Sequence, residues 1–140
     1  MGSLTNYMEN ALVNLYFGGT AFSNPGTHYF ALFTVDSTES SSGTEVSTGS
    51  WTNYARIAVT NDTTNYGTDT SNGLKANAVA INFGTATTTG DINVSAIGAF
   101  DASSGGNLLF YHVFTNDVVV QNGNDVTVPV GGFDVDFSAA

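Results

Sequence analysis

Hydrophobic residues recur at helical spacing only near the start of the chain, over residues 4–17. Apolar residues three or four positions apart share one face of a helix, so the spacing predicts an amphipathic helix. Ser3 is a suitable N-cap, and the glycines at 18 and 19 end the helix. Its apolar stripe must be buried, either on the chain's own sheet or on a neighbouring subunit. The candidate interface residues on this helix are Leu4, Tyr7, Met8, Leu12 and Leu15.

From residue 28 onward the hydrophobic period changes to two, which is typical of β-strands. Strand 28–35 is apolar on both faces and is therefore expected to be central and well covered. Near the end of the chain, Phe133 and Val135 point to one face while Asp134 and Asp136 point to the other. The pattern predicts strands at 28–35, 54–60, 77–83, 93–100, 108–115, 118–121, 125–130 and 133–137.

Polar and glycine-rich segments separate these strands. Residues 36–50 and 61–75 are long polar loops, and residues 101–107 read as a hairpin connection. Short strands with turns at near-regular spacing favour two packed sheets. We therefore predict a mainly β fold, an antiparallel β-sandwich of jelly-roll or Ig-like type. It has one N-terminal amphipathic helix and forms a single domain over residues 1–140.

The charge balance narrows the choice of partners. The chain carries twelve acidic residues against two basic ones, Arg56 and Lys75, and its net charge is −10. Such a chain repels phosphate backbones and anionic membrane surfaces, so we expect neither nucleic acid nor membrane as a partner. No apolar run approaches the roughly 20 residues of a membrane-spanning helix. There are no cysteines, which excludes disulfides and thiol chemistry.

A search for chemistry finds no catalytic constellation. His28 and His112 both fall in predicted strands without a second ligand nearby, so we interpret them as structural. Asp134 and Asp136 are either two Ca²⁺ ligands or an acidic ladder that discourages edge pairing. We therefore expect no enzyme activity, no catalytic residue and no cofactor.

Trp51 is the remaining candidate, because it lies in a polar stretch, residues 49–53, at the end of the first long loop. An exposed aromatic residue in a loop is a typical interface anchor. The alternative is that the loop folds back and Trp51 caps the core.

Several phrases of the sequence together resemble a known family. They are NYMENALVNLYFGGTAF, YFALFTVD, GTEVSTGSWTNYARIAVT, AIGAFDASSGGNLLFYHVFT and VVQNGNDVTVPVGGFDVDF. In the same order over nearly the whole chain, they resemble small virion proteins of tailed phages, described as capsid decoration (cement) or tail-fibre-like proteins. The long, serine-rich 36–53 loop departs from the usual pattern of that group.

The resemblance implies a structural role in the virion. The leading hypothesis is a capsid decoration or cement protein on the outer surface of the shell, which binds and stabilises the assembled state. The alternative is a tail or tail-fibre component that contacts the host surface. The expected partners are the major capsid protein or other virion proteins and further copies of the same chain, as a homo-oligomer.

Overall fold

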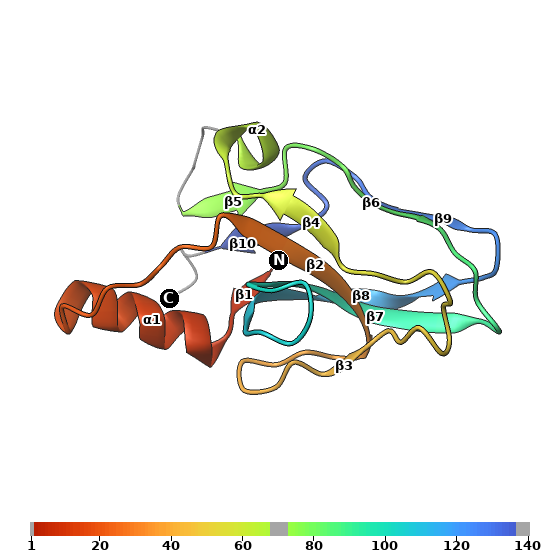
Figure 1. Cartoon of the computed structure of the whole chain (residues 1–140), viewed down its shortest axis with the longest axis horizontal. Coiled ribbons are helices and arrows are strands. Elements are labelled where there is room, and N and C mark those ends of the chain that lie inside the picture. Colours follow the sequence, from red (N-terminus) through yellow and green to blue (C-terminus); the bar gives the residue numbers. More distant parts are fainter. Residues whose placement is uncertain (1, 68–72, 137–140) are drawn as a thin grey trace.

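The computed structural model describes residues 2–67 and 73–136, and most of its regular structure is β (Figure 1). All pairs of its strands are antiparallel. In chain order the elements are β1 (Ser3–Leu4), α1 (Asn6–Phe17), β2 (Thr27–Val35), β3 (Thr44–Glu45), β4 (Ile57–Thr60), α2 (Thr63–Tyr66), β5 (Leu74–Ala76), β6 (Ile81–Thr85), β7 (Ile92–Phe100), β8 (Leu108–Val120), β9 (Asp125–Val128) and β10 (Asp134–Asp136).

The largest sheet is built around β2. Its strand order is β1-β8-β7-β2-β3, and β4 pairs with the same edge of β2 as β3 does, nearer the N-terminal end of β2. Both edges of β2 are therefore paired. The strand is also buried on both faces over most of its length, because the run from Phe30 to Phe33 is apolar throughout. The prediction of a central, well-covered strand at 28–35 is confirmed.

One face of this sheet is covered by two separate two-stranded ribbons, β6–β9 and β5–β10. The ribbons and the sheet share one apolar core, in which the rings of Phe30 and Phe133 meet edge to face at 4.9 Å. The predicted mainly β, antiparallel fold with one N-terminal helix is confirmed. Its second layer consists of ribbons rather than one continuous sheet, and the jelly-roll or Ig-like subtype stays a prediction.

The opposite face of the sheet carries a second, smaller core cluster, made by Ala31, Phe33, Ala96, Phe100 and Leu108. Gly98 of β7 permits this packing. A Cβ atom there would stand 2.7 Å from Leu108 Cδ1 and 3.0 Å from a ring carbon of Phe33. A larger residue at 98 would therefore push the strand away from its neighbours.

The first helix differs from the prediction at its beginning. It starts at Asn6, because Thr5 rather than Ser3 is the N-cap and accepts a hydrogen bond from the Met8 N–H. Leu4 lies outside the helix in β1, where it pairs with Phe110 of β8.

Other boundaries differ from the prediction because of contacts with segments that are distant in sequence. The two predicted strands at 108–115 and 118–121 form one strand, β8, with a bulge in which residues 114–117 lie opposite Ser95. The predicted strand at 77–83 begins only at Ile81. Before it, the buried Asn77 side chain donates to the Pro129 carbonyl at 2.8 Å and accepts from the Phe133 N–H at 2.9 Å. These bonds fix a turn where alternation alone predicts strand.

The two predicted loops contain short regular elements. The first includes β3, and the second includes α2 and β5. Of the predicted strand at 133–137, residues 134–136 form β10, and residue 137 lies outside the described residues.

Candidate interface at helix α1

Helix α1 is fixed to the sheet at its first turn. The Thr5 hydroxyl donates to the Leu108 carbonyl at 2.6 Å, and the Thr5 N–H donates to the Leu109 carbonyl at 3.1 Å. The Asn6 N–H donates to the Glu39 carbonyl at 2.8 Å, so the loop after β2 also holds the helix. Met8 is the buried residue of the helix. These contacts anchor its N-terminal end.

The outer half of α1 extends beyond the sheet, at the left of Figure 1. Several of its apolar side chains are exposed. The exposed fraction is 78% for Tyr16, 89% for Phe17 and 56% for Val13. A helix this short is marginally stable in water on its own, and burial of an apolar face normally stabilises it. The outer half of α1 therefore presents an apolar surface that the described residues leave uncovered.

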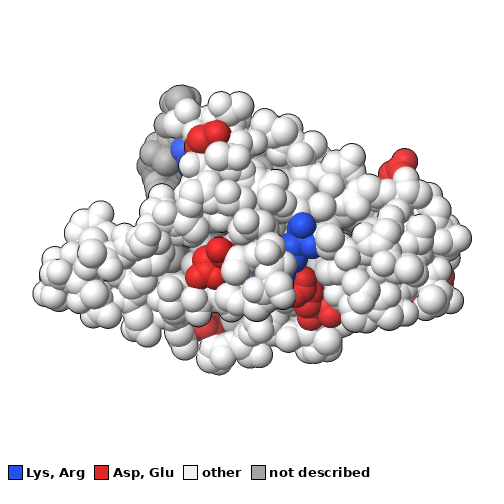
Figure 2. All heavy atoms as spheres, viewed as in Figure 1, with Lys and Arg blue, Asp and Glu red and all other residues white. Residues whose placement is uncertain are grey.

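This surface also lacks charge. Between Glu9 and Asp36 the sequence contains no Asp, Glu, Lys or Arg. In the space-filling view the outer end of α1 is white, whereas acidic side chains appear over the body of the molecule (Figure 2). On a chain with a net charge of −10, this uncharged surface lets a further acidic chain approach with little repulsion.

The predicted interface residues of the helix fall into two groups: those that pack into the chain's own core and those that are at least partly exposed. Met8 is 7% exposed and Leu4 packs against the main core, so both contribute to the chain's own fold. Leu12 is half-buried, whereas Tyr7 and Leu15 are 44% and 40% exposed. Sequence reasoning missed Val13, Tyr16 and Phe17, because they lie off the predicted stripe and only a pattern of burial could find them.

Trp51 is fully buried, with an exposed fraction of 0%. Its ring lies 5.6 Å from that of Tyr54, and its indole N–H donates to the Asn53 side-chain oxygen. The loop folds back over the core, as in the alternative considered from the sequence. In this chain Trp51 is a core cap and is not available as an exposed anchor.

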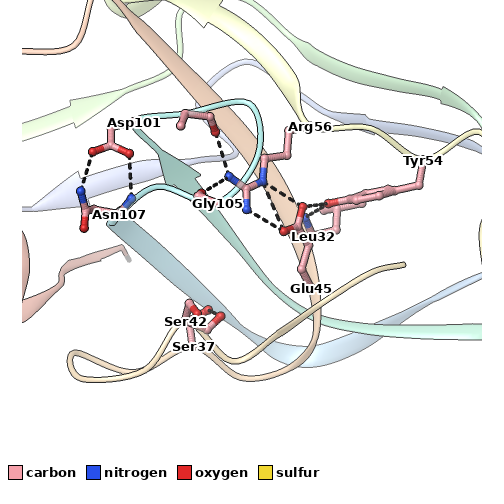
Figure 3. Close-up of polar contacts among 10 residues, drawn as sticks. Leu32, Ser37, Ser42, Glu45, Tyr54, Arg56, Asp101, Gly105 and Asn107 are labelled. Atoms are coloured by element: carbon pink, nitrogen blue, oxygen red, sulfur yellow. Dashed lines mark hydrogen bonds and ion pairs between the residues drawn. The ribbon is translucent and has the colours of Figure 1, made fainter. Parts of the chain in front are cut away.

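A second polar arrangement lies around Arg56, which we call the arginine clasp: Glu45, Tyr54, Arg56 and the 101–107 hairpin (Figure 3). The guanidinium binds the Glu45 carboxylate through Nε and Nη2, with an Nη2–Oε2 distance of 2.8 Å. Nη1 donates to the carbonyls of Ala102 and Gly105, both at 2.8 Å. The same group stacks over the Phe100 ring, 3.5 Å from its centroid.

The predicted hairpin at 101–107 is confirmed. Asp101 closes it by accepting from the Asn107 backbone N–H at 2.7 Å and from the Asn107 side-chain amide at 2.8 Å (Figure 3). The clasp then ties this hairpin to β2. The Tyr54 hydroxyl accepts from the Leu32 N–H at 2.9 Å and contacts Glu45 Oε1 at 3.1 Å. Burial raises the pKa of Tyr54, so the hydroxyl stays neutral.

The two histidines lie in strands of the main sheet. His28 Nδ1 and the Tyr66 hydroxyl are 2.8 Å apart, and burial lowers the pKa of His28. His112 Nδ1 lies 3.4 Å from Asp134 Oδ1, too long for a well-formed hydrogen bond. The pKa of His112 is lowered, chiefly by burial, while the Asp134 carboxylate acts in the opposite direction. The side chain of Asp136, the other half of the predicted acidic pair, lies outside the described residues.

Two further findings concern ligands and membranes. Within residues 2–67 and 73–136, no three His, Asp or Glu side chains are grouped so that they could hold a metal ion. Neither helix in the described part of the chain has the length and apolar character needed to cross a membrane.

Comparison with protein families matches residues 3–136 to the family described as Podophage GP4 fiber I protein gp80. A search of curated proteins finds no match. The matched segment includes every element of the fold, from β1 to β10.

Proposed function

This chain belongs to the podophage GP4 fiber I protein gp80 family and is thus a structural protein of a phage virion, and we propose that it is a component of a tail fibre. The family description names a fibre protein, which supports the tail-fibre alternative over capsid decoration, the hypothesis that the sequence analysis placed first. We further propose that its role is non-enzymatic and consists of binding other protein chains.

The observation that carries this proposal is the uncovered apolar end of α1. We propose that Val13, Tyr16 and Phe17 dock on a neighbouring virion protein or on a further copy of this chain. Complete burial of one such large side chain contributes roughly 1.5–3 kcal/mol, so the two aromatic residues together supply a substantial part of a specific contact. The anchored base of the helix keeps this surface in a fixed position relative to the sheet.

Self-association fits the charge distribution. Two copies, each with a net charge of −10, repel one another across most of their surfaces. The uncharged stretch from Asn10 to Val35 contains the outer part of α1 and provides a surface where this repulsion is smallest. Symmetric contacts through α1 would place the remaining acidic surfaces apart.

The direct test is incorporation of a double variant, Tyr16→Ser/Phe17→Ser, into phage particles. We expect the purified variant to keep its far-UV circular dichroism and melting temperature, since both side chains are exposed. Quantitative mass spectrometry of purified particles should then show at least a tenfold loss of the protein. The matched control is Val119→Ser on β8, an apolar side chain 51% exposed, which should be incorporated normally.

The position in the particle requires a separate measurement. Tail-less heads and complete particles from the same lysate should differ, with the protein present only where tails are present. Recovery of the protein from tail-less heads at the copy number of the shell subunit would instead support capsid decoration. Normal incorporation of the double variant would refute docking through α1 whichever position is found.

A further inference from the structure

A pocket of about 220 Å³ lies between the main sheet and the β5–β10 ribbon, beside α2. Its walls are mainly apolar and include Phe30, Ala76, Ala99, Phe110, Phe133 and Val135. Three of these, Phe30, Phe133 and Val135, also belong to the main core, so part of that core forms the pocket wall. Asn24 lines the pocket and is exposed, so the pocket reaches solvent beside the segment that precedes β2.

The pocket is large enough for an aromatic side chain. Protein interiors rarely contain voids larger than a water molecule. An engineered apolar cavity of about 150 Å³ binds benzene, which has the size of a phenylalanine ring. This pocket therefore accommodates one such ring, in contact with its aromatic walls.

Polar groups at the pocket are paired with one another. His28 Nδ1 lies 2.8 Å from the Tyr66 hydroxyl, and both residues line the pocket. The Asn61 side-chain amide donates to the Asn24 side-chain oxygen at 3.1 Å. Because these bonds are made within the chain, an apolar ring can occupy the pocket without breaking them.

The charge around the pocket is unlike that of the rest of the molecule. None of the described residues that line it is Asp or Glu, although the chain has a net charge of −10. Lys75 is among them, and its ammonium donates to the Gly67 carbonyl at 2.8 Å. A positive charge at the pocket attracts the electron-rich face of an aromatic ring.

The same chain carries an aromatic side chain of matching size. Phe17 is the last residue of α1 and is 89% exposed, so it does not occupy its own chain's pocket. Val13, Tyr16 and Phe17 lie at helix positions i, i+3 and i+4 and therefore share one face. This end of α1 is uncharged, so it can approach the pocket of another copy without bringing two negative charges together.

We propose that Phe17 of one copy inserts into this pocket of a second copy, with Val13 and Tyr16 packed around the mouth. The inference rests on the proposed docking through α1 and names the receptor of that docking. The helix end and the pocket lie on different elements, so every copy offers one of each. The contact closes by reciprocal insertion within a pair or by insertion around a ring.

Sedimentation velocity of the purified full chain measures this contact. We expect self-association with a dissociation constant of about 100 μM, because one inserted ring and two flanking side chains form a small interface. Phe17→Ser should weaken the association by about tenfold or more. The matched control is Val119→Ser, which removes an apolar side chain 51% exposed on β8 and should leave the association unchanged.

A variant of the pocket tests the receptor side. Ala76→Phe fills the pocket with a ring of its own and should weaken the association as much as Phe17→Ser does. Ala58→Phe is the matched control, because Ala58 is an exposed alanine of β4 that does not line the pocket. If Ala76→Phe does not fold, Asn24→Trp replaces it, since this exposed position blocks the pocket from outside.

Mixing the two defective variants tests the match between helix end and pocket. Phe17→Ser keeps an open pocket and Ala76→Phe keeps an intact helix end, so one complete contact can form between them. We expect the equimolar mixture to form a complex with one copy of each variant, although neither variant associates by itself.

Three results would overturn the inference: the original chain stays monomeric at about 1 mM, the folded pocket variants associate like the original chain, or the mixture remains two separate monomers. Docking through α1 is judged by a different measurement, the incorporation of Tyr16→Ser/Phe17→Ser into particles. Loss of that variant from particles, together with unchanged association of the pocket variants, would leave docking through α1 intact and reject the pocket as its receptor.

Discussion

The arginine clasp and the outer half of α1 show that regular secondary structure and firm attachment to the rest of the molecule are separate properties. The clasp joins irregular polar loops, yet Arg56 binds a carboxylate, two carbonyls and an aromatic ring. The outer half of α1 is regular helix, yet its apolar side chains extend into solvent. Periodicity determined where a helix forms, whereas contacts between distant segments determined which parts of the molecule are held firmly.

The physical reason lies in what each region can satisfy by itself. A helix pairs its own backbone groups internally and needs a partner only for its side chains. The 101–107 hairpin has no such ladder, so the Ala102 and Gly105 carbonyls need donors from elsewhere, and Arg56 supplies them. The clasp region therefore satisfies its polar groups within one chain, whereas the outer half of α1 leaves apolar side chains exposed.

The largest expected effect concerns the core beneath the clasp. Trp51→Ala removes a fully buried ring and should reduce the free energy of unfolding by about 3–5 kcal/mol. Urea denaturation followed by tyrosine fluorescence measures this change. Trp51→Phe is the matched control and should restore about half of the loss. A change below about 1 kcal/mol for Trp51→Ala would mean that the loop does not cap the core in solution.

The next largest effect concerns the clasp itself. Arg56→Met keeps much of the side-chain volume but removes the charge, and it leaves Glu45 without its ion pair. We expect a loss of about 3 kcal/mol in the free energy of unfolding, measured by urea denaturation. The Arg56 side chain is only 8% exposed, so water cannot replace the guanidinium effectively.

Arg56→Lys tests whether geometry or charge matters at this position. Lysine restores the charge but not the planar fork that reaches Glu45 and two carbonyls together. Its stability should therefore fall between those of Arg56→Met and the original chain. Equal stability of the lysine and arginine forms would show that the fork geometry contributes nothing.

The fold was largely predictable because strand alternation reports burial directly. The central strand at 28–35, the hairpin at 101–107 and the helix were all found from local pattern. The bulge of β8 and the turn held by Asn77 were not, because both depend on partners far away in sequence. Alternation continues through such places and gives no sign that pairing has shifted.

The candidate site was less predictable than the fold. Hydrophobicity marked α1 as a surface that needs covering, but the stripe chosen from spacing includes Met8, which the chain buries itself. Trp51 looked exposed because its neighbours in sequence are polar, although its neighbours in space are aromatic. Arg56 carried one available signal: it is one of only two basic residues in the chain.

A smaller effect on the free energy of unfolding is expected from a change in pH, which acts through the buried His28 of β2. Burial holds the folded-state pKa of His28 below its ordinary value of 6.5, so the unfolded chain binds a proton more readily. The contribution of neutral His28 to the free energy of unfolding is therefore complete above about pH 6.5. It is lost as the pH falls from there toward the pKa of His28 in the folded chain. His112 acts in the same direction.

His28→Phe isolates that contribution. Urea midpoints between pH 7.5 and 5 should fall with decreasing pH for the original chain and fall less steeply for the variant. The difference between the two slopes removes the contribution of the carboxylates, which both proteins share. Identical slopes would show that His28 titrates alike in the folded and unfolded chains.

The smallest effect on stability should come from the outer half of α1, the region through which we propose that the chain assembles. Tyr16→Ser/Phe17→Ser removes two side chains that touch little of their own chain, so the free energy of unfolding should change by no more than about 0.5 kcal/mol. Sedimentation velocity of the purified chain would measure any self-association lost at the same time. A stability loss comparable to that of Arg56→Met would show that α1 folds back on its own sheet in solution. The contrast between an anchored clasp and an uncovered helix would then disappear, because both regions would be held within one chain.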